Sequence, residues 1–302
     1  MRILRAAHLG MCFGVRDAIA LAFAHADAGP LTILGELVHN PAVLRALDAR
    51  GIAVAHDATQ VTTPTLMVTA HGTSQRTLER SRALGLTVVE ATCPLVRVAH
   101  RAVTALARDG YHVVIVGQRD HVEVRGLTGD LDRFDVVLDA ADVAALEEHT
   151  RFGVAAQTTQ PVERVRHLVE LIRRRFPESE VRVADTVCKP TKDRQTAAIE
   201  MSREADVVIV VGGPSSNNTR ELVTTCARYC SHVYHVQSES DVSPEWFDAA
   251  NVVGLTAGTS TPNDVIDRVE ARIRRCAERS PGPVHQTEAG MPARVGVVDG
   301  RR

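Results

Sequence analysis

Aromatic residues are scarce in this 302-residue chain, at 3% of the total. Proteins that bind single-stranded nucleic acid stack the bases on aromatic side chains, so we do not expect nucleic acid as a main partner. The hydrophobic core must come from Val, Ala, Leu and Ile instead, and hydrophobic residues make up 44% of the chain. With 24% charged residues, this composition is typical of a globular protein.

The chain also lacks an excess of one charge: it has 35 Lys and Arg residues and 37 Asp and Glu residues, for a net charge of -2. The chain therefore lacks a general field that would attract a polyanion or a membrane, and any anionic ligand must be held by local geometry. No apolar run is long enough to cross a membrane, and no signal-peptide core follows Met1 to Arg5. We therefore expect a cytoplasmic protein that does not bind membranes.

The six cysteines are too few and too scattered for a disulfide scaffold, and none forms the Cys-x-x-Cys pair of zinc ribbons and thioredoxin-like sites. Cys12, Cys93 and Cys188 lie 81 and 95 residues apart, each in a tight loop before a helical segment. This spacing divides the chain into near-equal thirds, so a pseudo-threefold arrangement would bring the three thiols together. The remaining cysteines are interpreted as packing residues: Cys226, Cys230 and Cys276.

Three convergent thiolates without a fourth protein ligand fit two kinds of metal site. One is an iron-sulfur cluster in which one iron lacks a protein ligand, and the other is a zinc site with one open position. Three unrelated cysteines are the third interpretation. The cysteine pattern alone leaves all three open.

Short apolar runs alternate with segments of helical period, a pattern typical of α/β proteins with a mostly parallel sheet. We expect strands at Leu31 to Leu34, Leu66 to Thr69, His112 to Val116, Gly153 to Ala156, Asp206 to Val211 and Val252 to Thr256. Small or polar residues follow every run. Ligands bind beyond the carboxyl ends of parallel strands, so the six tails indicate one shared polar pocket, although ordinary loops and helix N-caps use the same residue types.

Nine short motifs, in order and with compatible spacing, resemble the 4-hydroxy-3-methylbut-2-enyl diphosphate reductase family, also called LytB/IspH. The motifs are Cys12-Phe13-Gly14-Val15, Val38-His39-Asn40, Ala70-His71-Gly72, Ala91-Thr92-Cys93-Pro94-Leu95-Val96, His121-Val122-Glu123, Gln157-Thr158-Thr159, Asp185-Thr186-Val187-Cys188, Ser215-Ser216-Asn217 and Thr256-Ala257-Gly258-Thr259-Ser260. The resemblance extends from about residue 1 to about residue 278.

The resemblance implies an α/β fold, a trefoil of three related α/β units around a central iron-sulfur cluster. Each unit would have a mostly parallel sheet flanked by helices. We expect the units at residues 1–93, 94–187 and 188–278. Residues 279–302, with several Pro and Gly residues and little apolar periodicity, are expected to form a flexible tail, or a strap laid across the third unit.

The activity implied by the resemblance is the last step of the methylerythritol phosphate isoprenoid pathway. It is the reductive dehydration of (E)-4-hydroxy-3-methylbut-2-enyl diphosphate to isopentenyl diphosphate and dimethylallyl diphosphate. Cys12, Cys93 and Cys188 would hold a 4Fe-4S cluster whose fourth iron, without a protein ligand, binds the substrate hydroxyl. Glu123 would supply the proton that lets hydroxide leave as water, and Thr158 would relay or position it.

The family resemblance also implies the diphosphate contacts, which are His39, His71, His121, Ser215, Ser216, Asn217 and Ser260. Histidine suits this role because it donates strong hydrogen bonds and can become cationic beside phosphate. The chain has no glycine-rich dinucleotide fingerprint, so we expect an external electron donor such as ferredoxin or flavodoxin.

The chain departs from the commonest family pattern at Phe13, Gln118, Val122 and the short Gly213-Pro214 loop. We interpret these changes as subgroup variation, although a paralogue with a shifted substrate preference would carry the same changes. Two further alternatives are a non-catalytic cluster protein, which has no use for Glu123 and the histidines, and a phosphate-binding enzyme such as a sugar-phosphate isomerase. The second predicts a colourless protein with no bound iron.

Overall fold

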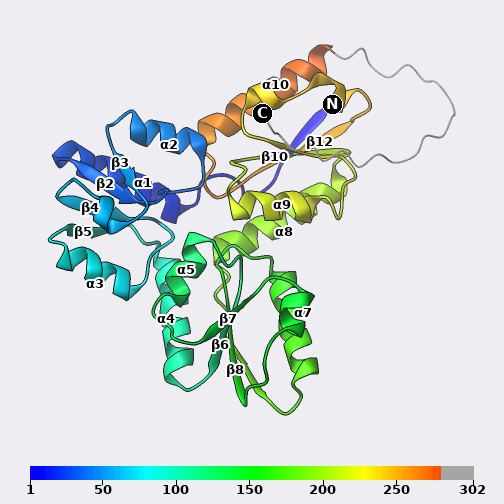
Figure 1. Cartoon of the computed structure of the whole chain (residues 1–302). Coiled ribbons are helices and arrows are strands. Elements are labelled where there is room, and N and C mark those ends of the chain that lie inside the picture. The colour runs from blue at the N-terminus through cyan, green and yellow to red at the C-terminus, as the bar shows by residue number, and fades with distance from the viewer. Residues whose placement is uncertain (280–302) are drawn as a thin grey trace.

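The computed structural model describes residues 1–279 and contains three four-stranded sheets, in which every strand pair is parallel (Figure 1). Each sheet belongs to one of three lobes, and helices cover the sheets. This arrangement confirms the expected α/β fold. No helix among the described residues is long and apolar enough to span a membrane.

The first two units have the same strand order. The first sheet runs β3-β2-β4-β5 and the second runs β7-β6-β8-β9. The elements of the first unit are α1 (Phe13–Ala28), β2 (Leu31–Leu34), α2 (Pro41–Asp48), β3 (Ala53–Ala55), β4 (Thr65–Val68), α3 (Gln75–Ala83) and β5 (Thr87–Glu90). Those of the second are α4 (Pro94–Arg108), β6 (His112–Val116), α5 (Val122–Thr128), β7 (Phe134–Val137), α6 (Ala140–Ala144), β8 (Arg151–Ala156), α7 (Val162–Arg175) and β9 (Glu180–Val183).

The third sheet repeats this order, but its fourth strand comes from the start of the chain. Its order is β11-β10-β12-β1, so β1 (Arg2–Arg5) occupies the place that β5 and β9 hold in the other sheets. Figure 1 shows the blue β1 among the yellow and orange elements of this lobe. The other elements are α8 (Lys189–Glu204), β10 (Val207–Val211), α9 (Asn217–Cys226), β11 (Val233–Val236), β12 (Val252–Ala257) and α10 (Asn263–Arg279).

The start of the chain thus differs from the expected division, which assigned residues 1–93 to the first unit. Parallel strands need a long crossover and no sequence adjacency, so a terminal strand can complete a distant sheet. The expected boundaries otherwise stay predictions. The expected flexible tail falls almost wholly on residues 280–302, outside the described part of the chain.

The six expected strands are β2, β4, β6, β8, β10 and β12, the two inner strands of each sheet. Inner strands are buried on both faces, so their sequences are continuous apolar runs that can be recognised. In β6, for example, Val113 and Ile115 face α4, whereas Val114 and Val116 face α7, in separate core clusters. The six edge strands were not predicted, because they are short and mix polar with apolar residues.

Candidate active site

Three cysteines occupy the same position in the three units. Each follows the fourth strand of a sheet and is the N-cap of the next helix: Cys12 for α1, Cys93 for α4 and Cys188 for α8. Each backbone N–H donates a hydrogen bond to a carbonyl in the tail of the third strand of that sheet. The acceptors are Thr259 for Cys12 (3.0 Å), Ala70 for Cys93 (3.1 Å) and Thr158 for Cys188 (3.0 Å).

The strand tails thus carry the three thiols to the centre of the molecule, as the spacing predicts. All three are free and half-buried. Gly14 lies against Cys93 so closely that a Cβ atom at Gly14 would be 2.5 Å from its Sγ. The Cys93 thiol therefore packs directly on the first turn of α1, at Gly14, two residues after Cys12.

The surroundings of the thiols suit a metal. Burial raises the pKa of Cys93 and raises that of Cys188 to about 11, although N–H groups of Leu95 and Val96 and the Thr191 hydroxyl oppose this. Without a metal these thiols stay protonated at neutral pH, whereas a bound metal displaces the proton. The amide groups and dipoles of three helices of 15 or 16 residues then stabilise the thiolates.

The described residues contain one group of three metal-ligating side chains with atoms close enough to share a single ion, and it consists of histidines, not of the cysteines. A mononuclear zinc site would hold its sulfur atoms about 2.3 Å from the metal and thus close to one another. The wider placement of the three thiols fits a multi-iron cluster better than one zinc ion.

Glu123 is fully buried in the first turn of α5, at 1% exposure. Thr158, at the end of β8, binds both carboxylate oxygens: its N–H donates to Oε1 (2.6 Å) and its hydroxyl to Oε2 (3.0 Å). Burial raises the pKa of Glu123 to about 7, and the two bonds from Thr158 oppose the shift. Glu123 therefore holds its proton up to about pH 7, and it lies close enough to Cys93 and Cys188 to interact electrostatically with both.

His39, His71 and His121 come together from two units, with ring centroids 4.7 to 5.4 Å apart. Burial lowers the pKa of His71 well below its usual value and that of His121 to about 3, and His39 lowers both further. Nδ1 of His121 accepts a hydrogen bond from the Glu123 N–H (3.1 Å), so its proton is on Nε2. The buried Nε2 atoms of His39 and His71 have no hydrogen-bond partner among residues 1–279.

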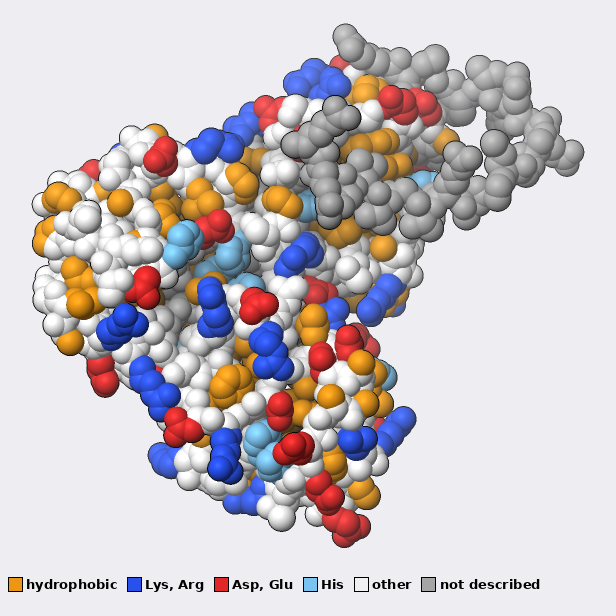
Figure 2. All heavy atoms as spheres, viewed as in Figure 1, with side chains coloured by type: hydrophobic (Ala, Val, Ile, Leu, Met, Phe, Trp, Pro, Cys, Tyr) orange, Lys and Arg blue, Asp and Glu red, His pale blue; other side chains and the backbone are white. Residues whose placement is uncertain are grey.

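The three histidines line a small cavity together with residues of the third unit. Of the predicted substrate contacts, six line it: His39, His71, His121, Ser216, Asn217 and Ser260. Ser216 also caps α9, since its Oγ accepts from the Thr219 N–H. Figure 2 shows a group of pale-blue histidine side chains in a hollow between the lobes.

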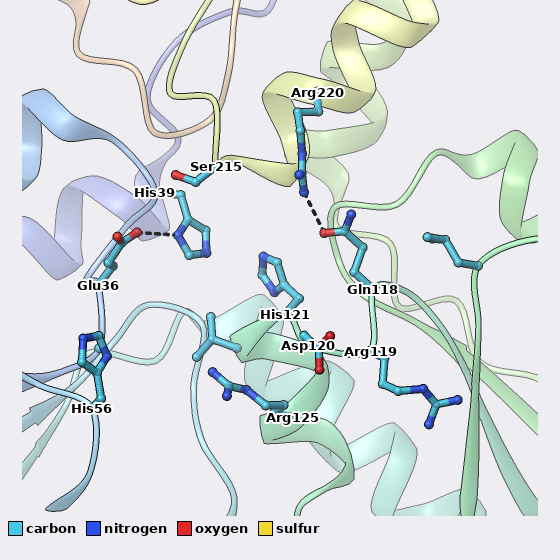
Figure 3. A pocket seen from close by; sticks show the side chains of 13 residues that line it. Glu36, His39, His56, Gln118, Arg119, Asp120, His121, Arg125, Ser215 and Arg220 are labelled. Atoms are coloured by element: carbon cyan, nitrogen blue, oxygen red, sulfur yellow. Dashed lines mark hydrogen bonds and ion pairs between the residues drawn. The ribbon is translucent and has the colours of Figure 1, made fainter. Parts of the chain in front are cut away.

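Ser215 lies elsewhere, exposed on the wall of a larger outer cavity of about 570 Å³ that also reaches His39 and His121 (Figure 3). Arg220 and Arg125 line the same cavity, and Arg220 donates to the Gln118 side chain (2.7 Å). The outer cavity is therefore the polar approach to the histidines.

A family model described as LytB protein matches residues 3–274 of this chain. The chain belongs to the LytB family. It is 36% identical to the 4-hydroxy-3-methylbut-2-enyl diphosphate reductase of Pelobacter propionicus over 275 residues, 90% of this chain and 98% of the relative. The reductase of Geobacter sulfurreducens is 36% identical over 284 residues, 93% of this chain and all of the relative.

Two solved structures of the family share the fold. The E-1-hydroxy-2-methyl-but-2-enyl-4-diphosphate reductase of Plasmodium falciparum has a TM-score of 0.84 at 26% identity, and the match covers 89% of this chain and 87% of that one. A structure of (E)-4-hydroxy-3-methyl-but-2-enyl diphosphate reductase has a TM-score of 0.65 at 35% identity, covering 91% of this chain and all of the other.

The departures from the LytB pattern lie around the site without removing any predicted site residue. Phe13 is 38% exposed and lines a surface cavity with Cys12. The Gln118 side chain accepts a hydrogen bond from Arg220, and Val122 is the first residue of α5. Gly213 packs on the loop of His39, because a Cβ atom there would lie 2.6 Å from the His39 carbonyl oxygen.

Sequence reasoning singled out neither Glu36 nor Arg194, which both contact predicted site residues or their loops. Glu36 accepts a hydrogen bond from Nδ1 of His39 (2.9 Å), and its position three residues earlier was the available signal. Arg194 donates to the carbonyl of Gly10, in the loop before Cys12, and to the carbonyl of Pro190, in the first turn of α8 after Cys188. Only the tertiary structure places Arg194 there.

Proposed function

We propose that this chain is a 4-hydroxy-3-methylbut-2-enyl diphosphate reductase. The substrate gains two electrons and two protons, its allylic C–O bond breaks, and the hydroxyl leaves as water, giving isopentenyl and dimethylallyl diphosphates. One observation carries the proposal: three equivalent cysteines converge beside a buried, protonated Glu123 and a cavity lined by three histidines. The names of the LytB relatives support it.

The proposed cofactor is a 4Fe-4S cluster held by Cys12, Cys93 and Cys188 through three of its irons. Three half-buried thiols at the N-termini of three helices, spaced too widely to share one ion, fit this group. When bound, the cluster supplies the electrons and an open iron for the substrate oxygen. The electrons come from an external donor, ferredoxin or flavodoxin.

The proposed diphosphate site is the histidine cavity. His71 and His121 are neutral and each can donate one hydrogen bond, which suits a phosphate oxygen without adding charge. His39 differs, because its Nδ1 bonds to Glu36 and its Nε2 is free. Nε2 is therefore the His39 atom that faces the cavity and can meet a phosphate oxygen. Ser216, Asn217 and Ser260 add polar contacts from the third unit. Ser215, which lines the outer cavity, would contact the end of the diphosphate nearest to that cavity.

Glu123 is the proposed proton donor. Burial keeps the carboxyl protonated near neutral pH, and the substrate's diphosphate adds negative charge that strengthens this state. Thr158 bonds to both oxygens and so fixes the orientation of the carboxyl group, and the hydroxyl of Thr158 can pass a proton onward. A solvated surface carboxylate would offer neither property.

Two alternative functions fit the site less well. A non-catalytic cluster protein needs the cysteines but not a buried acid bonded to Thr158. A phosphate-binding isomerase needs the histidine cavity but leaves three equivalent thiols unexplained. A family member that prefers a different allylic diphosphate would retain all these features.

The test is anaerobic reconstitution with iron and sulfide, followed by oxidation of a reduced viologen on addition of the hydroxymethylbutenyl diphosphate. Formation of both five-carbon diphosphates supports the proposal. A stable cluster without turnover overturns the substrate assignment and favours a sensor or a shifted-substrate enzyme. No cluster at all overturns the cofactor assignment.

Cys93→Ser is the matching variant for the cofactor. It removes one thiolate ligand, so the cluster and the activity should disappear together, as measured by iron and sulfide content and by turnover. Cys276→Ser, a buried cysteine in α10, is the control and should keep both. Full cluster content in Cys93→Ser would contradict the assignment.

A further inference from the structure

Arg194 is a buried cation without a carboxylate partner. Arg194 lies in the second turn of α8 and is 6% exposed. It forms no ion pair within residues 1–279. The adjacent Asp193 pairs instead with Lys189 (2.9 Å). Buried charges in proteins are normally paired with an opposite charge, because desolvation is costly. An anion is therefore missing from the surroundings of Arg194.

The hydrogen bonds of Arg194 show where the anion belongs. Its guanidinium donates to the carbonyl of Pro190 (3.0 Å), two residues after Cys188, and to the carbonyl of Gly10, two residues before Cys12. The guanidinium thus ties the first turn of α8, which begins after Cys188, to the loop that leads to Cys12. Its Nε is buried and has no hydrogen-bond partner in the described part of the chain.

Of the groups that can become negative, Cys12 and Cys188 have the largest electrostatic effects on Arg194. Burial lowers the pKa of Arg194, and Cys12 and then Cys188 raise it again, ahead of Asp193. Arginine stays protonated in proteins, so the guanidinium contributes a full positive charge beside these two sulfur atoms. Three thiolates on a cluster are the anion that this charge lacks.

We propose that Arg194 is the buried counter-charge of the cluster and raises its reduction potential. This inference rests on the cofactor proposed above. Each electron that enters makes the cluster one unit more negative, and a desolvated cation stabilises the reduced form more than the oxidised form. Charge and hydrogen bonding around a cluster are known determinants of its potential. Arg194 is thus a positioning residue that acts on the substrate only through the cluster.

The experiment compares Arg194→Gln, Arg194→Lys and wild type after reconstitution, by dye-mediated redox titration followed by electron paramagnetic resonance. We expect Arg194→Gln to lower the equilibrium constant for one-electron reduction at least tenfold, a shift of about 59 mV to more negative potential. Arg194→Lys keeps the charge and should keep most of the potential. Arg16→Gln, an exposed arginine in the wall beside Cys12, is the control and should shift it much less.

The outcomes separate the two proposals. If wild type forms no cluster, the cofactor assignment fails before Arg194 is tested on it. If wild type forms the cluster and Arg194→Gln has its unchanged potential, the counter-charge is wrong. Arg194→Gln and Arg194→Lys could also both lose the cluster, or both shift its potential equally. In either case the effect of Arg194 comes from its hydrogen bonds to Gly10 and Pro190 and not from its charge, and the proposal is again overturned.

Discussion

Glu123 is a carboxyl group whose surroundings keep it protonated near neutral pH, because burial raises its pKa to about 7. If it is the proton donor, wild-type turnover should decrease as pH rises through about 7. Glu123→Gln keeps the shape but cannot donate a carboxyl proton, so turnover should fall roughly 10²- to 10⁴-fold while the cluster remains. Viologen oxidation at several pH values, with iron content measured in parallel, checks both effects. Normal turnover in Glu123→Gln would show that another group donates the proton.

The same pKa shift predicts how stability depends on pH in the cluster-free protein. The pKa of Glu123 in the folded protein lies above the ordinary value of 4.5. The contribution of protonated Glu123 to the free energy of unfolding is therefore fully present below pH 4.5 and is lost as pH rises through about 7. The loss amounts to about 3 kcal/mol at 1.36 kcal/mol per pKa unit. Urea unfolding at pH 5 and pH 8 should show that Glu123→Gln reduces this pH dependence. An equal dependence in both proteins would contradict the burial of an ionisable group there.

His39 is predicted to bind the diphosphate through its free Nε2. Because a hydrogen bond to a charged group contributes about 1.5–3 kcal/mol, His39→Ala should raise the KM roughly 10- to 100-fold. His167→Ala removes an exposed histidine on α7 and should leave the KM unchanged. Steady-state kinetics with both variants checks this. Equal KM values would remove His39 from the diphosphate site.

At the scale of secondary-structure elements, the contact between α1 and the start of α4 decides where Cys93 lies. Gly14 is inside α1, where alanine is the better helix former, so Gly14→Ala should not weaken the helix itself. Its Cβ, however, would lie 2.5 Å from Cys93 Sγ and must displace it. We expect a folded protein that binds much less iron after reconstitution, measured together with circular dichroism.

Gly29→Ala is the matched control at the other end of α1. Gly29 has an extended backbone and no atom within 4 Å of an added Cβ, so iron content should equal that of wild type. Full iron content in Gly14→Ala would show that Cys93 has room to move without losing the cluster.

At the scale of the whole molecule, contacts between units keep the site assembled. Arg164 in α7 bonds to Glu221 in α9, which links the second unit to the third, and both side chains are largely buried. Arg164→Ala leaves Glu221 without its cation, and we expect a loss of roughly 1–3 kcal/mol, below the 3–5 kcal/mol of a fully buried pair. The shift of the urea midpoint measures the loss.

Arg174→Ala is the control for this ion pair on the same helix. Arg174 pairs with Glu170 at 3.7 Å, and both are well exposed, so its removal should cost less than about 0.5 kcal/mol. Equal effects of the two substitutions would mean that the Arg164–Glu221 contact does not hold the units together.

Most of the fold was predictable where local sequence carries a strong signal. The inner strands β6 and β10 are runs of valine and isoleucine buried on both faces. Edge strands such as β1, with Arg at both ends, give no comparable signal, because half of each strand faces solvent. The sequence predicted that each of the three cysteines lies in a loop before a helix. Their equivalent positions became visible only in the structure, because β1, the strand before Cys12, completes the third sheet.

The sequence by itself determined the α/β class, the inner strands and the set of candidate residues, because apolar periodicity and short motifs are local properties. Only the tertiary structure decided that β1 completes the third sheet and so places Cys12 opposite its two counterparts. It also decided the protonation of Glu123 and the buried, unpaired state of Arg194. Desolvation and charge pairing depend on which distant segments exclude water from a group, and no local pattern records that.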